Sequence, residues 1–193
     1  TERSLTEPAL VFDLNLGGTL GVVEFWRTKG CKLIYAGSST KFADDGLGRD
    51  QSPYAWSKAV NTELVRNYGT WYGLPYAITY FYNVYGPDER AGAYGTVIEI
   101  FRERRLAGKP LIVTAPGTQT RNFTHIDDII DGLVRVGKEG VGDDYGIGDE
   151  RAYSIKEVAE LFGGEIQMGP PAKGNRFASV IDTSKTRALG WQP

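Results

Sequence analysis

The sequence predicts an α/β protein with parallel β-strands, and three consecutive segments carry this prediction. Residues 32–36 and 76–80 are short apolar runs that are typical of buried strands. Residues 53–72, between them, carry apolar side chains at helical spacing, and the preceding Ser52 with Pro53 marks a helix start. A strand, a helix and a second strand in this order form a βαβ unit, whose strands are parallel.

The rest of the chain alternates between helix and strand patterns in the same way. Residues 12–29 have apolar side chains at helical spacing and end at Gly30, which predicts a helix before the first strand. Downstream, the same signals predict a helix over 96–107, a strand over 111–114, a helix from Asp127 as N-cap to about Gly137, a strand or turn over 145–148, a helix from the capping box of Ser154 and Glu157 to Gly163, and a short helix between Asp182 and Gly190.

The composition is that of a soluble globular protein large enough for one core. Of 193 residues, 41% are hydrophobic and 24% are charged. The sequence has no continuous apolar stretch of the roughly 20 residues that a membrane span needs, and its first residues show no signal-peptide pattern. A cytoplasmic location is therefore expected. The net charge of −2 argues against a nucleic-acid partner.

Cysteine and histidine each occur once, and these counts exclude whole classes of site. Cys31 is the only cysteine, so the chain can form neither an internal disulfide nor a cysteine zinc site. His125 is the only histidine, which rules out a histidine-cluster metal site and argues against a Ser-His-Asp hydrolase. No metal site is expected.

The predicted helix over 53–72 places a phenol and an ammonium on one face. Tyr54 and Lys58 are four residues apart, so their side chains lie on neighbouring turns. A free tyrosine has a pKa of roughly 10, and a nearby cation lowers the pKa of a phenol by stabilising its phenolate. Such a phenol can exchange a proton with a substrate hydroxyl. The spacing alone also arises by chance in many helices.

A cluster of hydroxyl side chains follows the first predicted strand. In an open α/β sheet, ligands bind at the carboxyl ends of the strands, which is where Gly37-Ser38-Ser39-Thr40 lies. Ser38 is the first hydroxyl after the strand and the preferred candidate; Ser39 is less favoured. The alternative is that Ser38 merely caps the strand end.

The order of motifs resembles the extended short-chain dehydrogenase/reductase family, and within it the NAD-dependent nucleotide-sugar epimerases of the UDP-glucose 4-epimerase type. The resemblance implies a Rossmann-like, doubly wound parallel sheet, of which this chain holds the C-terminal part, and a smaller α/β substrate-binding subdomain. Five stretches carry it: Asn15 with Gly18-Thr19, Ser38-Ser39 after a strand, Tyr54 with Lys58, residues 81–87 (FYNVYGP) and residues 121–128 (RNFTHIDD).

The resemblance also divides the chain. Residues 1–87 would be the remaining part of the NAD-binding domain, and residues 88–193 would mostly form the substrate-binding subdomain, with about 127–149 returning to the sheet. The family's N-terminal strand and Gly-x-x-Gly-x-x-Gly turn, which hold the NAD pyrophosphate, do not occur in the sequence. We therefore expect an incomplete copy of a longer chain; the alternative is a fragment with half a cofactor site.

By this resemblance the reaction is epimerisation at C4 of a nucleotide-diphosphate sugar through a 4-keto intermediate, with NAD as cofactor. Tyr54 would take the proton of the sugar 4-hydroxyl, Lys58 would assist it and bind the nicotinamide ribose, and Ser38 would hydrogen-bond the same sugar oxygen. The expected substrate is a UDP-sugar.

The remaining site residues are likewise implied by the resemblance. Asn15 and Tyr82 would contact the cofactor, and Asn83 and Arg121 would contact the substrate, Arg121 at its diphosphate. A turn-forming asparagine and a solvated surface arginine are the alternatives for Asn83 and Arg121. A second diphosphate-binding residue is expected in Arg176, or else Lys173, because Ala172 occupies the family's arginine position.

Three questions stay open at this stage. The helices over 12–29 and 53–72 would form a homodimer contact by resemblance, whereas core packing explains the apolar stripe on the second helix equally well.

A 4,6-dehydratase typically has Asp-Glu directly after its catalytic hydroxyl, where this chain has Ser39-Thr40; a decarboxylase or reductase remains open. A non-catalytic sugar-nucleotide-binding relative would have no need for Ser38, Tyr54 and Lys58 together.

Overall fold

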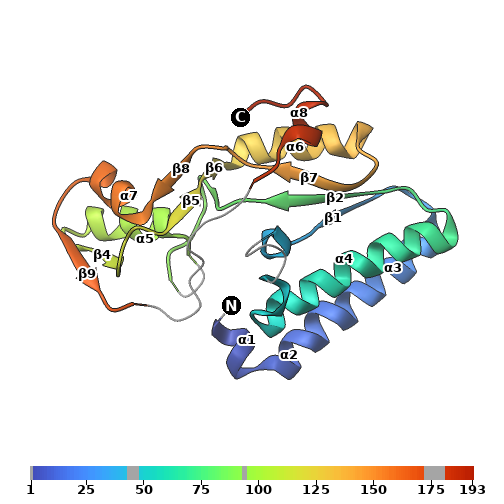
Figure 1. Ribbon diagram of the computed structural model, residues 1–193, viewed down its shortest axis with the longest axis horizontal. Coiled ribbons are helices and arrows are strands. Elements are labelled where there is room, and N and C mark those ends of the chain that lie inside the picture. Colours follow the sequence, from blue (N-terminus) through green and yellow to red (C-terminus); the bar gives the residue numbers. More distant parts are fainter. Residues whose placement is uncertain (1, 43–47, 93–94, 172–180) are drawn as a thin grey trace. The chain divides into compact units, whose positions relative to one another are not determined.

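The computed structural model describes residues 2–42, 48–92, 95–171 and 181–193. Its contacts divide the chain into two compact units (Figure 1). Unit 1 comprises residues 1–81, 131–147 and 180–192, and unit 2 comprises residues 82–130 and 148–179. The chain therefore leaves unit 1 after β2, returns to it within α6, and returns again at its end.

Unit 1 is built on a three-stranded parallel sheet with the order β1-β2-β7. The strands are β1 (Leu33–Ala36), β2 (Tyr76–Phe81) and β7 (Gly142–Ile147). Tyr35 of β1 lies opposite Ile78 of β2. The central strand is buried from Ala77 to Tyr80, as its apolar sequence predicts. The predicted βαβ unit with parallel strands is thereby confirmed.

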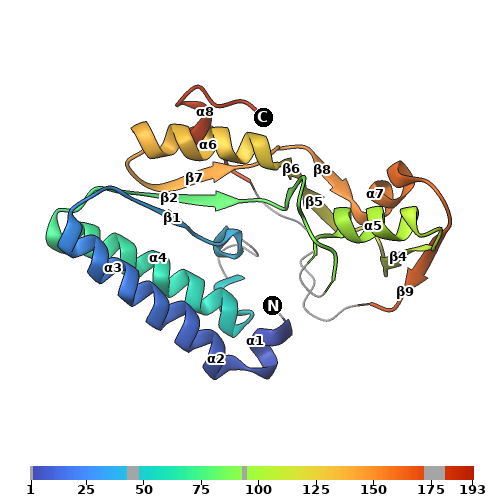
Figure 2. The same cartoon turned by 180° about the vertical axis from the view of Figure 1, so that it is seen from behind.

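Helices cover both faces of this sheet (Figures 1 and 2). α3 (Gly18–Lys29) and α4 (Pro53–Tyr72) lie side by side on one face, and the second part of α6 (Ile126–Glu139) with α8 (Ser184–Arg187) lies on the other. α4 has the predicted bounds because Ser52 caps its start, accepting the Ala55 N–H at 3.1 Å, and Gly73 ends it with φ 62°.

The first helix is longer than predicted and contains a π-helical turn. α1 (Glu2–Thr6) and α2 (Pro8–Phe12) precede a π-turn over Asp13–Gly17, which leads directly into α3. The helical run Pro8–Lys29 is long and apolar enough, by length and composition alone, to cross a membrane, which the sequence analysis did not expect. Within unit 1 it packs against α4 with Val23 and Trp26 buried, and most of its other apolar side chains are exposed.

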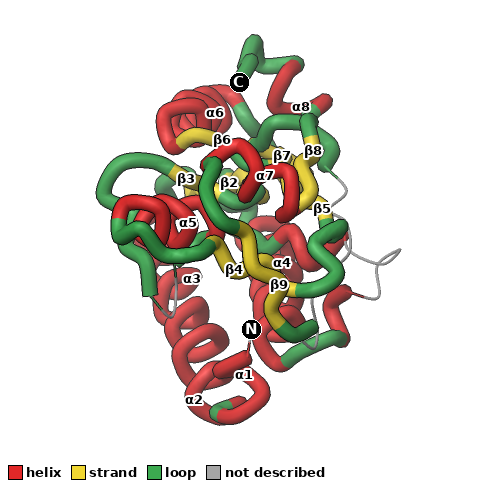
Figure 3. Tube along the Cα trace, turned by 90° about the vertical axis from the view of Figure 1, so that its left-hand side faces the viewer, coloured by secondary structure: helices red, strands yellow, loops and turns green. Residues whose placement is uncertain are grey.

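Among the described residues, unit 2 contains three pairs of short strands and two complete helices around its own core (Figure 3). β3 (Val84–Tyr85) pairs with β6 (Thr124–His125) and β4 (Leu111–Thr114) with β9 (Ile166–Gly169), both parallel, whereas β5 (Thr120–Asn122) and β8 (Ala152–Ser154) are antiparallel. α5 (Val97–Leu106) and α7 (Ile155–Phe162) complete the core, which includes Phe101, Leu111, Val113, Val158 and Ala159. The predicted capping box of Ser154 and Glu157 opens α7.

Two local predictions are corrected by the structure. Asp127 is not an N-cap, because α6 begins at Ile126 directly after β6, and the His125 ring accepts the Asp127 N–H at 3.3 Å instead. The C-terminal stretch up to Gln192 belongs to unit 1, whereas most of the chain from residue 88 onward was expected in the substrate-binding subdomain. Thr186 donates from Oγ1 to the Gly146 carbonyl at 2.7 Å, which attaches α8 to β7.

Candidate active site

Unit 1 brings Ser38, Tyr54 and Lys58 to the carboxyl end of β1. Ser38 is two residues beyond Ala36, the last residue of the strand, and Tyr54 and Lys58 lie on the first two turns of α4. Lys58 Nζ donates a hydrogen bond of 2.8 Å to the Ala36 carbonyl. This bond joins the second turn of α4 to the strand end that precedes Ser38. That Ser38, Tyr54 and Lys58 form one site at this edge stays a prediction.

The Lys58 ammonium is held by β1 and not by Tyr54. Besides Ala36, it donates to the Tyr35 hydroxyl at 3.1 Å, and its nitrogen lies 4.7 Å from the Tyr35 ring centroid. Within the described part of the chain, the Tyr54 hydroxyl has no hydrogen-bond partner and Lys58 forms no hydrogen bond to it. One of the three N–H donors of Lys58 therefore remains for a ligand.

Ser38 shares its hydroxyl with a neighbour on the same turn. Its Oγ lies 2.9 Å from the Thr40 Oγ1, and the Thr40 N–H points to it at 3.4 Å. A 3₁₀ turn over Ser39–Phe42 sets this geometry. Gly37 is required just before it, because a Cβ there would lie 2.5 Å from the Tyr80 ring.

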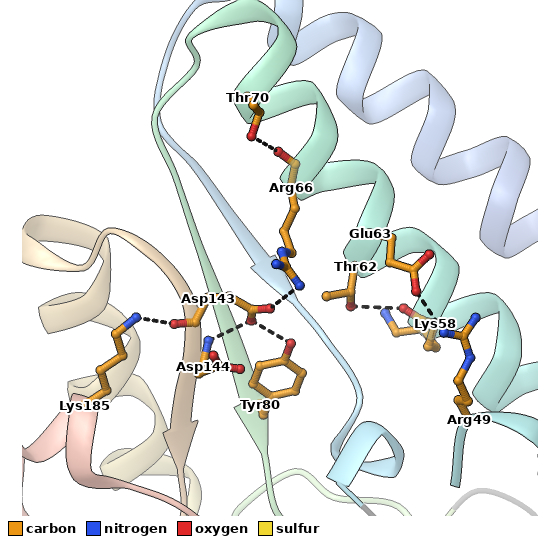
Figure 4. A network of polar contacts seen from close by, with 10 residues as sticks. All are labelled: Arg49, Lys58, Thr62, Glu63, Arg66, Thr70, Tyr80, Asp143, Asp144 and Lys185. Atoms are coloured by element: carbon orange, nitrogen blue, oxygen red, sulfur yellow. Dashed lines mark hydrogen bonds and ion pairs between the residues drawn. The ribbon is translucent and has the colours of Figure 1, made fainter. Parts of the chain in front are cut away.

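A network of polar contacts between β2, β7 and α4 holds the Tyr80 hydroxyl in place (Figure 4). Its hydroxyl donates to Asp143 Oδ1 at 2.7 Å, and Asp143 also accepts the Asp144 N–H at 2.7 Å and lies 3.8 Å from Arg66. Burial, and then the bond to Asp143, raise the pKa of the Tyr80 hydroxyl far above its ordinary value. Tyr80 therefore stays protonated and serves the fold.

Asn15 lies on the π-turn and is bound to α4 through its side chain and through its backbone carbonyl. Its Nδ2 donates to Ser57 Oγ at 2.9 Å, and its carbonyl accepts from Asn61 Nδ2 at 2.9 Å. Ser57 in turn donates to the Tyr54 carbonyl at 2.9 Å. Asn15 thus anchors the helix that carries Tyr54, and its predicted contact with the cofactor stays a prediction that depends on Oδ1.

Asn61 is a site-supporting residue that the sequence analysis missed. It is buried in the middle of α4, and its Oδ1 has no partner among the described residues. The available signal was an amide two turns after Tyr54, on the apolar side of a helix, where it needs a partner. The acceptor of its Nδ2, the Asn15 backbone carbonyl on the π-turn, is not visible in the sequence.

Unit 2 contains the other predicted residues. Tyr82 is buried, Asn83 has φ 36° and donates from Nδ2 to the Asn122 carbonyl at 2.8 Å, and Arg121 donates to the Thr120 carbonyl at 2.7 Å. The positive φ of Asn83 favours its role in the turn between β2 and β3. Arg176 and Lys173 lie outside the described residues. The binding roles of all five stay predictions.

Unit 2 also has a hollow of about 410 Å³ between α5 and the end of β3 with the residues that follow it. Its charged lining consists of Asp88, Glu89, Glu99, Arg102 and His125. Arg102 binds Glu99 through two hydrogen bonds of 2.7 Å, which lower the pKa of the Glu99 carboxyl. In the residues that the structure describes, no group of three or more His, Cys, Asp or Glu side chains is placed to hold a metal ion.

Comparison with known proteins decides the family. The sequence model of the NAD dependent epimerase/dehydratase family matches residues 1–148. The chain belongs to this family. The predicted resemblance to the extended short-chain dehydrogenase/reductases, and the Rossmann-like fold that it implies, are confirmed.

Individual members of the family are similar to the whole length of the chain. It is 28% identical over 210 residues to the UDP-glucose 4-epimerase of Mycolicibacterium smegmatis, covering 100% of this chain and 67% of that protein. It is 35% identical over 209 residues to the UDP-glucuronate 4-epimerase of Thermodesulfobacterium geofontis, covering 98% and 63%. A crystal structure of UDP-glucose 4-epimerase with UDP-glucose from Thermotoga maritima has 25% identity and a TM-score of 0.92, covering 100% and 68%. Relatives and structural neighbours also include UDP-sugar decarboxylases and dTDP-glucose 4,6-dehydratases.

This family of sugar-nucleotide enzymes uses NAD, and the residues of unit 1 fit the ribose and nicotinamide end of that cofactor. Lys58 retains one N–H donor, and Tyr54 retains its hydroxyl, beside the carboxyl end of a parallel strand. The glycine-rich turn that would hold the pyrophosphate is not part of the 193-residue sequence.

Proposed function

We propose that this protein epimerises a UDP-sugar at C4 through a 4-keto intermediate. The observation that carries the proposal is the 2.8 Å bond from Lys58 to the Ala36 carbonyl, which brings the Tyr54 helix to the strand end at Ser38. The similarity to two 4-epimerases over nearly the whole chain supports the choice of reaction. We propose a UDP-sugar as the substrate because the names of these two relatives state UDP-glucose and UDP-glucuronate.

In this proposal Tyr54 takes the proton from the sugar 4-hydroxyl. Because a phenol is a poor base at neutral pH, its phenolate needs a nearby positive charge. Lys58 supplies that charge, and its two bonds to β1 hold it in place. The Ser38 hydroxyl, which pairs with that of Thr40, hydrogen-bonds the same sugar oxygen and helps to relay the sugar's proton to Tyr54. NAD, when bound, accepts the hydride from C4 and returns it.

Unit 2 supplies substrate binding in this proposal, with Arg121 and Arg176 at the diphosphate and Asn83 at the sugar-phosphate. A planar guanidinium offers paired donors that match phosphate oxygens. We place Asn15 and Tyr82 at the cofactor. The sequence motif and the family pattern support these roles.

A 4,6-dehydratase is the second candidate, and the turn after Ser38 argues against it. Water elimination needs an acid and a base near C5 and C6, and the turn offers the hydroxyls of Ser39 and Thr40 in place of two carboxylates. Thr40 moreover spends its hydroxyl on Ser38. The decarboxylases among the relatives keep that reaction as a third candidate.

The same proposal includes a cytoplasmic homodimer that uses α3 and α4. Large apolar side chains on these helices are exposed, with Phe25 at 60%, Trp71 at 63% and Tyr72 at 50%. Exposed patches of this kind mark protein contact surfaces. Sedimentation of the protein should give twice the chain mass, and a Phe25→Glu, Trp71→Glu variant should give the chain mass.

The reaction is tested with UDP-sugars that carry deuterium at C4. The protein, supplied with NAD, is incubated with UDP-glucose, UDP-N-acetylglucosamine and UDP-glucuronate, and products are analysed by NMR. Epimerisation predicts the C4 epimer of one of them, with deuterium retained at C4. A 4-keto-6-deoxy product or release of carbon dioxide would assign the chain to a dehydratase or decarboxylase, and no change in any sugar would contradict the proposal.

A further inference from the structure

We propose that Tyr35 is a positioning residue of this site, holding the Lys58 ammonium so that its third N–H donor faces the reacting ligand. The inference rests on the proposed function for its consequence in catalysis, but its structural part stands on the contacts of unit 1 alone. The family resemblance assigns no role to Tyr35. The sequence predicts a contact of the Lys58 ammonium with the Tyr54 phenol, and in the structure the ammonium contacts the Tyr35 phenol instead.

The donor count of Lys58 is the first step. An ammonium has three N–H donors and no acceptor. Two of them are used by the Tyr35 hydroxyl at 3.1 Å and the Ala36 carbonyl at 2.8 Å. Because both acceptors belong to β1, they fix the direction of the third donor, which has no acceptor among the described residues.

The second step is that Tyr35 itself is held rigidly. It lies within β1, paired with Ile78 of the buried strand β2, and its carbonyl accepts the Thr79 hydroxyl at 3.4 Å. Sites built on strands are more precise than sites built on loops. The half-buried ring also lies 4.7 Å from the ammonium, which adds a cation–π attraction to the hydrogen bond.

The third step concerns what a lysine does without such a partner. Its ammonium is a compact charge on a flexible four-carbon stem, so a single bond to a carbonyl leaves it several rotamers. Tyr35 adds a second fixed point. The positive charge then stays near Tyr54 without occupying the Tyr54 hydroxyl, which remains available for the substrate.

The direct test compares Tyr35→Phe with Tyr76→Phe. Tyr35→Phe removes the hydroxyl and keeps the ring, whereas Tyr76→Phe removes a hydroxyl from the neighbouring strand that does not contact Lys58. Lysine ammonium groups are observed by ¹H–¹⁵N NMR at low temperature, where only hydrogen-bonded ones exchange slowly, and Lys58→Arg identifies the Lys58 signal. We expect the signal in the wild type and in Tyr76→Phe, and its loss in Tyr35→Phe. An unchanged signal in Tyr35→Phe overturns the proposal.

The kinetic test separates positioning from structure. We expect Tyr35→Phe to lower kcat about tenfold, the order of one hydrogen bond to a charged group, with the KM for the sugar nucleotide unchanged within twofold. Thermal melting of both variants checks that the fold is kept. A lost ammonium signal with unchanged kcat overturns the catalytic consequence. If the wild type turns over no UDP-sugar, the proposed function fails while the NMR comparison still decides the position of Lys58.

Discussion

Units 1 and 2 hold their predicted functional residues in different ways. In unit 1, Lys58 and Asn15 each form side-chain bonds to a different element, so strand β1, the π-turn and helix α4 fix one another. In unit 2, Asn83 lies on a turn and donates to the Asn122 carbonyl of β5, and Arg121 lies on the three-residue strand β5 and donates to the carbonyl of its chain neighbour Thr120. The predicted residues of unit 1 thus lie on a long helix beside a strand of the sheet, whereas those of unit 2 lie on a turn and a short strand.

The largest expected effect is the loss of the charge in unit 1. Lys58→Met should lower kcat by about 10²- to 10⁴-fold, because a positioned proton-transfer group contributes that much and Tyr54 depends on the nearby cation. Steady-state kinetics with the UDP-sugar substrate measures it. Lys138→Met, which removes an exposed lysine from α6, is the control and should keep kcat. A kcat of Lys58→Met within fivefold of the wild-type kcat would contradict a catalytic role for this residue of unit 1.

A binding residue in unit 2 should behave in the opposite way. Arg121→Ala should raise KM about 10- to 100-fold while kcat changes little, because a diphosphate contact serves ground state and transition state alike. Arg151→Ala, an exposed arginine beside the neighbouring strand, should leave both constants unchanged. A fall in kcat with constant KM in Arg121→Ala would place Arg121 with the catalytic residues.

The close packing of unit 1 can be tested at Gly37. Gly37→Ala should lower the free energy of unfolding by about 1–3 kcal/mol, because the new Cβ would lie 2.5 Å from the buried Tyr80 ring. Gly21→Ala is a matched control on α3, where no atom lies within 4 Å of the new Cβ, and it should be neutral or stabilising by about 1 kcal/mol. Urea unfolding measures both. Equal stabilities of the two variants would show that this strand end is not closely packed.

The smallest effect concerns the capping box of unit 2. Hydrogen bonds from Ser154 hold the pKa of Glu157 below its ordinary value near 4.5. Since the folded-state pKa is the lower one, the stabilisation is present above pH 4.5 and is lost as pH falls below it. As pH falls below 4.5, the free energy of unfolding of the wild type should decrease more than that of Glu157→Gln, as measured by urea unfolding at several pH values. Glu160→Gln on the same helix is the control and should follow the wild type.

The sequence predicts what depends on local signals. The bounds of α4 follow from Ser52-Pro53 and Gly73, and Ser38, Tyr54 and Lys58 follow from one strand and one helix. The strand β7 was expected only as a short strand or turn, because Gly142, Asp143 and Asp144 have the composition of a loop. It forms a strand because it pairs with the buried β2, and Tyr80 gives Asp143 a buried partner.

Other features depend on contacts that lie far apart in the chain. The roles of Tyr35 and Asn61 arise only when β1 and the π-turn meet α4, and neither residue has a local pattern that identifies its partner. The helix start at Pro8 was missed because the residues before Phe12 bury little apolar surface. The binding roles in unit 2 are the least predictable, since they depend on loop conformation.

The most direct test of the central claim follows oxidation of the sugar in a single turnover. The NAD-loaded protein is mixed with its UDP-sugar, and absorbance at about 340 nm reports the transient reduction of the nicotinamide. We predict a rapid rise in the wild type and, because Tyr54 is the proposed final acceptor of the 4-hydroxyl proton, a rise at least about 100-fold slower in Tyr54→Phe. A rise of equal rate in Tyr54→Phe would contradict the account.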